Sequence, residues 1–240
     1  MMIKLAVSGC QGRMGQRITS LALLDKQFKV SALLENKDRP DVPLLSNNIP
    51  VHFDDTALKG SDVLIEFTTP EATIAHLKSC QQYGVNMVIG TTGLTKAQVT
   101  QIKKASAKIA IVFSSNMSVG VNLVFGLIRQ AAQVTGNDYA ITLSETHHVH
   151  KKDAPSGTAK TMAEIAEQYA KTIVQDISSI REGEVIGDHT INFESPADLI
   201  SIHHHAKTRD IFAEGSLVAA KFLSKKKKGL FNMQDVLGLK

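Results

Sequence analysis

Short apolar runs alternate with segments of helical spacing over the first 115 residues of this 240-residue chain. The apolar runs occupy residues 3–8, 29–35, 63–67, 85–89 and 109–113, and the helical segments lie near 18–25 and over 70–83 and 95–106. Strands that alternate with helices of about 10–15 residues predict a parallel α/β sheet with helices on its faces. Residues 38–50 contain three prolines and two asparagines, so we expect a loop there.

The pattern changes after Asn116. Helices are expected over 123–134, 159–174 and 216–223, and strands over 139–146, 190–194 and 199–205. The last two strands alternate in the way expected of an antiparallel sheet with one covered face. The sequence therefore predicts a Rossmann-like α/β domain followed by an α+β domain with a mixed or antiparallel sheet.

Composition narrows the function classes. Hydrophobic residues make up 43% and charged residues 21%, which indicates a globular chain and excludes a disordered or collagen-like one. The net charge of +4 is small and partly local to Lys225–Lys228, so we expect no nucleic-acid partner. No apolar run has the ~20 residues of a membrane span, and Cys10 and Cys80 form no disulfide framework. A cytoplasmic protein is expected.

A glycine loop, Gly9-Cys10-Gln11-Gly12-Arg13-Met14-Gly15, follows the first strand and opens a helix. Glycines allow a pyrophosphate to approach the backbone, and helix N-terminal N–H groups favour anions. Glu35 lies 20 residues beyond Gly15, where an acid accepts hydrogen bonds from an adenosine ribose. A tight turn with an unrelated acid is the alternative. Asn36, Lys37 and Arg39 follow the acid, so both NADH and NADPH remain open as cofactors.

Two further segments, Gly90-Thr91-Thr92-Gly93 and Ser114-Ser115-Asn116-Met117, stand at the carboxyl ends of predicted strands. Those ends face the ligand crevice of an open parallel sheet. Their hydroxyl, amide and N–H groups suit a nicotinamide ribose and carboxamide, although both segments also make good turns.

Histidines and lysines gather in residues 145–159, ETHHVHKKDAPSGTA. This segment leaves a strand and enters a helix capped by Ser156 or Thr158, whose first N–H groups can hold a carboxylate. A histidine exchanges protons near neutral pH, and the lysines add positive charge. Zinc binding and a basic surface loop are the alternatives, but no cysteine or second acidic residue has metal-ligand spacing, so we expect no metal. His203-His204-His205 lies on a strand, whose alternation prevents all three from entering one site.

The chain resembles the 4-hydroxy-tetrahydrodipicolinate reductase (dihydrodipicolinate reductase) family. The matching pieces run almost end to end: GCQGRMG at 9–15, ALLE at 32–35, VIGTTG at 88–93, SSNMSVGVN at 114–122, ETHHVHKKDAPSGTA at 145–159, GDHT at 187–190 and GLFNMQDVL at 229–237. The motif at 145–159 is highly specific, whereas the glycine loop alone is not.

The resemblance implies a dinucleotide-binding domain built from 1–116 and 215–240, with a substrate-binding and oligomerisation domain at 117–214 between them. It implies a homotetramer that reduces a cyclic dicarboxylate imine with NADH or NADPH and loses water. His147 would then be a proton donor and acceptor, and Lys151 a second proton donor. His148, Ser156, Gly157 and Thr158 would bind the substrate. The cofactor positions would be Gly9, Cys10, Gln11, Gly12, Arg13, Met14, Glu35, Gly90, Thr91, Thr92, Ser114, Ser115, Asn116 and Met117.

Two departures from the family pattern stand out. Many relatives carry arginine directly after the strand-two acid, where this chain has Asn36. The chain is also short, because the stretch near 36–50 is abbreviated and a hairpin-sized piece is missing between Ile173 and Gly187. Subunit contacts are expected to change rather than catalysis.

Other nicotinamide enzymes fit less well. Short-chain reductases need Tyr-x-x-x-Lys, and none of the three tyrosines has a lysine four residues later. A semialdehyde dehydrogenase needs a nucleophilic cysteine in its second domain, but Cys10 and Cys80 lie in the first. A nucleotide sensor without catalysis would leave His147 and Lys151 without a purpose.

Overall fold

A computed structural model describes residues 2–39 and 42–239. The chain divides into two compact units. Unit 1 contains the described residues up to Met117 together with Phe212–Val236, and unit 2 contains Ser118–Ile211 and residues 237–239. Among the described residues, no helix is long and apolar enough to cross a membrane.

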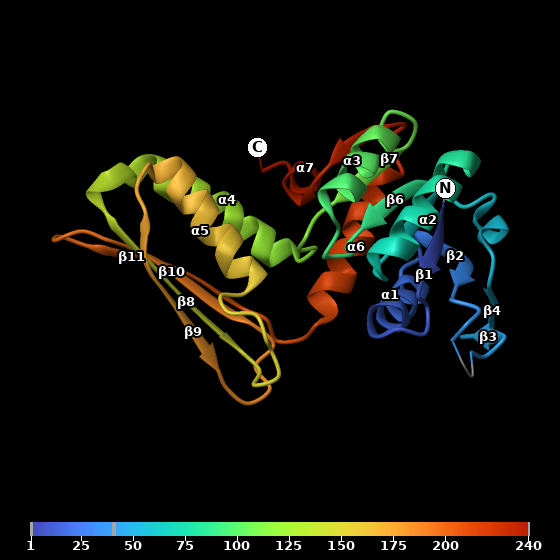
Figure 1. Ribbon diagram of the computed structural model, residues 1–240, viewed down its shortest axis with the longest axis horizontal. Helices are drawn as coiled ribbons and strands as arrows, with labels where there is room; N and C mark the ends of the chain where they lie inside the picture. The colour runs from blue at the N-terminus through green and yellow to red at the C-terminus, as the bar shows by residue number, and fades with distance from the viewer. Residues whose placement is uncertain (1, 40–41, 240) are drawn as a thin grey trace. The chain divides into compact units, whose positions relative to one another are not determined.

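Unit 1 is built on an eight-stranded sheet with the order β12-β7-β6-β5-β1-β2-β4-β3 (Figure 1). Its strands are β1 (Ile3–Ser8), β2 (Phe28–Leu34), β3 (Leu45–Ser46), β4 (Ile49–His52), β5 (Val63–Glu66), β6 (Asn86–Ile89), β7 (Ala110–Phe113) and β12 (Gly229–Phe231). All neighbouring strands pair in parallel except β3 and β4. The chain passes from β1 to β2 and then returns to β5 on the other side of β1, so the topological switch point lies between β1 and β5.

Helices cover both faces of this sheet. They are α1 (Arg13–Leu24), α2 (Pro70–Tyr83), α3 (Lys96–Ala105), α6 (Asp210–Leu223) and α7 (Met233–Leu237), with a short 3-10 helix η1 (Asp55–Leu58). One core joins α1, α6 and α7 to the sheet, and a second joins α2 and α3 to its other face. The central strands β1, β5, β6 and β7 are largely buried, which explains their mostly apolar sequences. The predicted Rossmann-like domain is confirmed.

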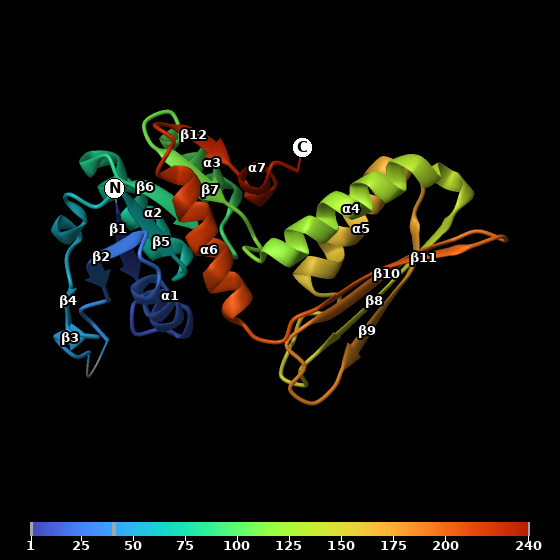
Figure 2. The same ribbon diagram turned by 180° about the vertical axis from the view of Figure 1, so that it is seen from behind.

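Unit 2 is a four-stranded mixed sheet with two helices on one face (Figures 1 and 2). Its strands are β8 (Ala140–His147), β9 (Val174–Arg181), β10 (Asp188–Glu194) and β11 (Leu199–His205), in the order β11-β10-β8-β9. The helices are α4 (Val119–Thr135) and α5 (Gly157–Ala170), and η2 (Gly136–Asp138) follows α4. Only β8 and β9 run parallel. This arrangement confirms the predicted second sheet.

Burial alternates strictly along β8. Ile141, Leu143, Glu145 and His147 are buried on the helix-covered face, and the residues between them are half-buried on the other. Two ionisable side chains therefore continue the line of the apolar core at the carboxyl end of β8.

The structure differs from the local predictions in three respects. The loop expected over 38–50 contains β3 and the start of β4, although residues 40 and 41 lie outside the described part. The helix expected to reach Val174 ends at Ala170, because Lys171 adopts a left-handed conformation with φ 58° and Val174 already begins β9. Strands β9 and β12 and helix α7 were not predicted, because each shows too little periodicity.

Candidate active site

The glycine loop of unit 1 turns tightly from β1 into α1. Gly9 has φ +59°, and a Cβ there would lie 2.8 Å from Thr68 Cγ2. Gly12 is the N-cap of α1, with no side-chain cap, and its N–H donates to Gly9 O at 2.8 Å. Gly15 packs directly on the loop, since a Cβ there would lie 2.1 Å from Gly9 O. The first N–H groups of α1 have no partner within the helix, which makes this turn an anion site.

Glu35 is tied to the glycine loop. Its Oε2 accepts hydrogen bonds from Gln11 N at 2.9 Å and from Arg39 Nη1 at 3.3 Å, and its Oε1 accepts from Asn36 N at 3.0 Å. Arg39 also donates through Nη2 to Gln11 O at 3.3 Å. The guanidinium therefore lies beside the acid and over the loop, and it places positive charge where an adenosine ribose would meet Glu35.

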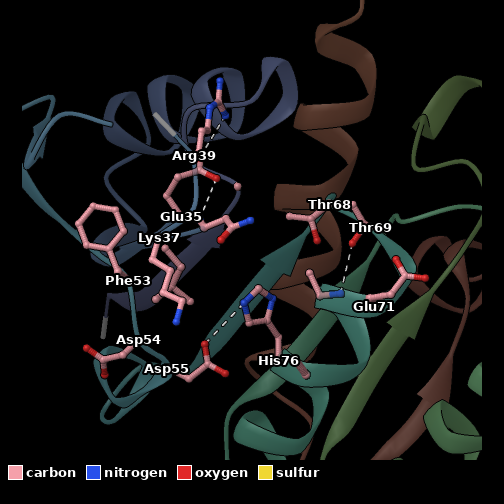
Figure 3. Close-up of a pocket in the computed structure, with 15 residues that line it drawn as sticks. Glu35, Lys37, Arg39, Phe53, Asp54, Asp55, Thr68, Thr69, Glu71 and His76 are labelled. Atoms are coloured by element: carbon pink, nitrogen blue, oxygen red, sulfur yellow. Dashed lines mark hydrogen bonds and ion pairs between the residues drawn. The ribbon is translucent and has the colours of Figure 1, made fainter. Parts of the chain in front are cut away.

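A cavity of about 730 Å³ opens beside Glu35 (Figure 3). Its lining joins the carboxyl ends of β1, β2 and β5 to the start of α2, and includes Gly9, Arg39, Phe53, Thr68 and His76. Figure 3 shows the His76 ring facing Asp55 on the side of the cavity away from Arg39. A cavity of this size at the switch point is where open α/β sheets bind ligands.

A buried network that sequence reasoning missed supports this cavity. Glu66, fully buried at the end of β5, accepts hydrogen bonds from Ser8 Oγ at 2.7 Å and from Thr68 Oγ1, and pairs with His76 Nδ1 at 2.5 Å. His76 Nε2 lies 3.5 Å from Asp55 Oδ1. Burial alone would lower the pKa of His76, but the two carboxylates outweigh it and raise this pKa. No sequence motif joins these positions, which lie on four separate elements.

The other two predicted cofactor segments end neighbouring strands of unit 1. Gly90 stands against the Phe67 ring, where a Cβ would come within 2.3 Å of the ring carbons. The buried Thr91 hydroxyl accepts from Thr68 N at 3.2 Å and pairs with Thr73 Oγ1 at 2.9 Å, so it is used inside the unit. Ser114 Oγ donates to Asn116 O at 2.9 Å. All of these positions lie at the carboxyl edge of the parallel strands.

Unit 2 pairs a buried histidine with a buried carboxylate. Glu145 Oε2 and His147 Nδ1 are directly hydrogen-bonded, and Arg181 Nη2 donates to Glu145 Oε1 at 3.0 Å. Burial works against the charge on Glu145, but Arg181 and His147 outweigh it and lower the Glu145 pKa. Burial also lowers the pKa of His147, more than Glu145 raises it. His147 is therefore neutral near pH 7, with its proton on Nδ1 and a lone pair on Nε2.

His189 on β10 lies beside this pair. Its ring stands edge-on to His147 with centroids 5.0 Å apart, and its Nε2 lies 3.2 Å from Ser156 Oγ. Ser156 caps α5 by accepting from Ala159 N at 3.1 Å. His189 is buried, its Nδ1 has no hydrogen-bond partner among the described residues, and burial lowers its pKa to about 4. Sequence reasoning missed this residue, although it lies in the GDHT motif.

Acid should destabilise unit 2 through His189. The folded pKa is about 4 whereas an unfolded histidine titrates at 6.5, so the unfolded state takes up the proton first as the pH falls. The free energy of unfolding should drop by up to ~3 kcal/mol between these two values. Urea unfolding at pH 7 and pH 4.5 should show a smaller difference for His189→Gln than for wild type. Equal differences would contradict this account.

Lys151 and the start of α5 complete the site. Lys151 Nζ pairs with Asp153 Oδ1 at 2.9 Å, which lowers the pKa of Asp153. His148, also a predicted substrate residue, is half-buried, and its Nδ1 has no hydrogen-bond partner in the part of the chain that the structure describes. Gly157 is the first residue of α5, and no atom of residues 2–39 or 42–239 outside its own neighbourhood lies within 4 Å of where its Cβ would be. A positive side chain and helix N-terminal amides thus lie on one short segment, which suits an anionic ligand.

The same region brings possible metal ligands together more closely than the sequence spacing indicated. Ligand atoms of Glu145, His147 and His189 all lie within 4.8 Å of one another. However, the Arg181 guanidinium donates a hydrogen bond to one oxygen of Glu145, and the positive charge of Lys151 lowers the pKa of His147. Two positive groups beside the cluster favour handling of protons and anions over binding of a cation.

The three consecutive histidines of β11 divide between the two faces of the sheet, as predicted from strand alternation. His203 and His205 pair with Asp188 on the open face, at 3.8 and 2.6 Å. His204 lies on the other face, against Gly120.

Comparison with known proteins identifies the family. Two family models, described as "Dihydrodipicolinate reductase, N-terminus" and "Dihydrodipicolinate reductase, C-terminus", match residues 3–117 and 120–237. The chain belongs to the dihydrodipicolinate reductase family. The predicted resemblance is thereby confirmed.

Individual relatives of this reductase agree along their whole length. The 4-hydroxy-tetrahydrodipicolinate reductases of Nitrosomonas eutropha and Nitrosomonas europaea are 41% and 40% identical, and each alignment covers at least 99% of both chains. The first alignment spans 271 positions against 240 residues here, which agrees with the expected shortening. A dipicolinate-bound dihydrodipicolinate reductase from Paenisporosarcina sp. TG-14 superposes with a TM-score of 0.86 over 98% of this chain and 99% of its own, at 26% identity.

An amine dehydrogenase from Mycobacterium smegmatis shares only the fold. It has a TM-score of 0.67 at 9% identity, over 96% of this chain and 95% of its own.

Proposed function

We propose that this reductase converts 4-hydroxy-tetrahydrodipicolinate to tetrahydrodipicolinate with NADH or NADPH, as the names of its relatives indicate. The observation that carries the proposal is the Glu145–His147 pair, which lies on one connected segment with Lys151 and the amino end of α5. This segment provides a proton acceptor, a cation and amide donors for a carboxylate.

The reaction needs a hydride, a proton and a route for water to leave. The nicotinamide supplies the hydride when it is bound. The substrate hydroxyl leaves as water, and the overall reaction takes up one proton from solution. His147, neutral through burial, accepts a proton at Nε2 and returns it, and Lys151 donates from its ammonium group. A Cβ at Gly187 would lie 3.1 Å from His147 Nε2, so the absence of a side chain there keeps the reacting nitrogen open.

The substrate carries two carboxylates. The amides of Gly157 and Thr158 at the amino end of α5 are assigned to one of them, with His148 and Lys151 adding a donor and a positive charge. Ser156 uses its hydroxyl on Ala159 N and His189, and its N–H on Glu145 Oε1 at 3.3 Å. Ser156 is therefore assigned to support the site through these hydrogen bonds, and its neighbours Gly157 and Thr158 are assigned to the ligand.

Unit 1 is assigned to the cofactor, and its family and fold support a nicotinamide dinucleotide. The pyrophosphate would lie on the glycine loop and the adenosine in the cavity beside Glu35 and Arg39. The remaining predicted positions, Gly90–Thr92 and Ser114–Met117, would meet the nicotinamide half. Because Arg39 already neutralises Glu35, a 2′-phosphate is not repelled, and we propose that both cofactors are used.

Unit 2 is assigned to substrate binding and to assembly of a cytoplasmic homotetramer. The sheet face opposite α4 and α5 carries the half-buried, short polar side chains of Thr142, Ser144 and Thr190, together with the charged Asp188 and Glu194. Such a face suits contact with a second copy. Light scattering that gave the 26.0 kDa mass of a single chain would contradict the assembly.

The test of the reaction is the loss of 340 nm absorbance on mixing the enzyme with freshly made 4-hydroxy-tetrahydrodipicolinate and either NADH or NADPH. Turnover supports the proposal, and the ratio of the two rates measures the cofactor preference. Binding of both cofactors without turnover would overturn it in favour of a nucleotide-sensing protein.

Arg39→Ala should separate the two cofactors. A charge-assisted hydrogen bond to the 2′-phosphate is worth about 1.5–3 kcal/mol, so KM for NADPH should rise about 10–100-fold while KM for NADH changes little. Lys59→Ala, which removes an exposed cation outside the cavity, is the matched control. Lys37→Ala, measured in the same way, shows whether Lys37 or Arg39 contacts the 2′-phosphate. An equal rise for both cofactors would show that Arg39 shapes the loop instead.

A further inference from the structure

One guanidinium connects the two parts of the proton-transfer site in unit 2. Arg181 ends β9 directly opposite His147 in the parallel register with β8. Its Nη2 donates to Glu145 Oε1 at 3.0 Å and to Asp153 O at 2.5 Å, and its Nε donates to Lys151 O at 3.4 Å. The Arg181 side chain is 19% exposed. Its donors are thus directed into the protein.

The first connection fixes the histidine. Glu145 is completely buried, and both of its carboxylate oxygens are hydrogen-bonded. Oε2 pairs with His147 Nδ1, and Oε1 accepts from Arg181 Nη2 and Ser156 N. A carboxylate held from two sides cannot rotate away, so the His147 proton stays on Nδ1 and Nε2 stays the exchanging atom. Nε2 in turn faces the space that Gly187 leaves open.

The second connection fixes the lysine. The carbonyls of Lys151 and Asp153 both accept from Arg181, and the Asp153 side chain pairs with Lys151 Nζ at 2.9 Å. The backbone around this loop is also tied to the end of β9, since Glu182 N donates to His147 O at 2.8 Å and Val149 N donates to Gly183 O at 3.1 Å. The loop that carries the lysine is therefore anchored to the same guanidinium as the histidine.

We infer that Arg181 is a positioning residue that holds His147 and Lys151 in one fixed geometry, through the Glu145 carboxylate and two loop carbonyls. This inference rests on the proposed function and extends it to a residue outside the substrate and cofactor sets. Arginine is required because its planar fork presents five donors, whereas a lysine ammonium cannot reach a carboxylate and two carbonyls at once. A displacement of about 1 Å in such a site costs about 100-fold in rate.

Arg181→Lys and Arg181→Ala test the inference in the full-length protein. In both variants kcat should fall about 100-fold while KM for the nicotinamide cofactor stays within twofold. Added guanidinium ion should restore part of kcat in Arg181→Ala and none in Arg181→Lys. Lys160→Ala, which removes an exposed cation from α5, is the control and should keep the wild-type kcat.

The pH profile separates positioning from plain destabilisation. The charge of Arg181 lowers the pKa of His147, so the acid limb of kcat/KM should move to higher pH in Arg181→Ala, which removes that charge, and stay close to wild type in Arg181→Lys, which keeps it. A rise in substrate KM with kcat unchanged would instead make Arg181 a substrate ligand and overturn the inference. An unchanged kcat in both variants, or an acid limb that does not move in Arg181→Ala, would overturn it as well.

A measurement without substrate separates this inference from the proposed reaction. The ¹⁵N shifts of His147 in the free protein should report a proton on Nδ1 in wild type and a mixture of tautomers in Arg181→Lys. The same tautomer in both proteins overturns the positioning role whatever the turnover. A changed tautomer in an enzyme that does not reduce 4-hydroxy-tetrahydrodipicolinate supports Arg181 and refutes only the substrate.

Discussion

His147→Gln should lower kcat by about 10²–10⁴-fold while the Kd values of NADH and NADPH remain within twofold of wild type. Glutamine can still donate a hydrogen bond to Glu145, but it cannot exchange a proton near neutral pH. The proposed cofactor residues belong to unit 1 and His147 to unit 2, so binding and chemistry should separate in this variant. Steady-state kinetics and fluorescence titration of the cofactor provide the two measurements.

His150→Gln is the matched control for this prediction. His150 lies three residues further along the chain; its side chain is 73% exposed and pairs at 3.2 Å with that of Glu184, which is 80% exposed. An exposed pair of this kind contributes little, so kcat should remain within about twofold. Full turnover of His147→Gln with intact cofactor binding would show that another group carries the proton.

The pH profile of the wild-type enzyme follows from the same residue. His147 must be neutral to accept a proton, and burial lowers its pKa below the ordinary 6.5. The value of kcat/KM should therefore hold steady through neutral pH and fall only below 6.5, as the imidazole becomes protonated. An acid limb above 6.5 would mean that Glu145 outweighs burial in the working enzyme.

Much of unit 1 could be predicted because its information is local. Strand β1 and helix α2 have the predicted bounds, since an uninterrupted apolar run defines the first and Thr69, Pro70 and Gly84 mark the ends of the second. The glycine loop and the strand-end segments were found for the same reason. Parallel strands then bring their carboxyl ends to one edge without any further signal.

The supporting residues of both sites could not be found in this way. Glu66 and His76 meet only because β5 and α2 pack together, and Arg181 reaches Glu145 only because β9 pairs with β8. Strand β9 itself carries a weak alternation beside the shortened segment, so neither the strand nor its register was evident. The residue types within one motif predict its chemistry. Contacts between side chains on different strands and helices depend on a pairing register that only the fold supplies.

Gly15→Ala should reduce the free energy of unfolding by about 3 kcal/mol, the upper end of what overpacking costs. A Cβ at this position would lie 2.1 Å from Gly9 O and 2.8 Å from Cys10 Cα, and neither atom belongs to a side chain that can move aside. Helix α1 must therefore shift away from the loop, taking its amino-terminal N–H groups with it. The Kd of both nicotinamide cofactors should rise at least about tenfold, because those groups form the proposed pyrophosphate site.

Gly157→Ala is the matched comparison, because it places the same methyl group in the first turn of another helix. Nothing lies within 4 Å of the added Cβ, and the backbone there is already helical. Stability should stay the same or rise by about 0.4–1 kcal/mol, through the smaller entropy of the unfolded chain. Urea unfolding of the two variants beside wild type separates a steric conflict from a general effect of replacing glycine. If Gly15→Ala unfolded like wild type and bound NADH equally well, the close approach of α1 to the loop would not be what fixes the cofactor site.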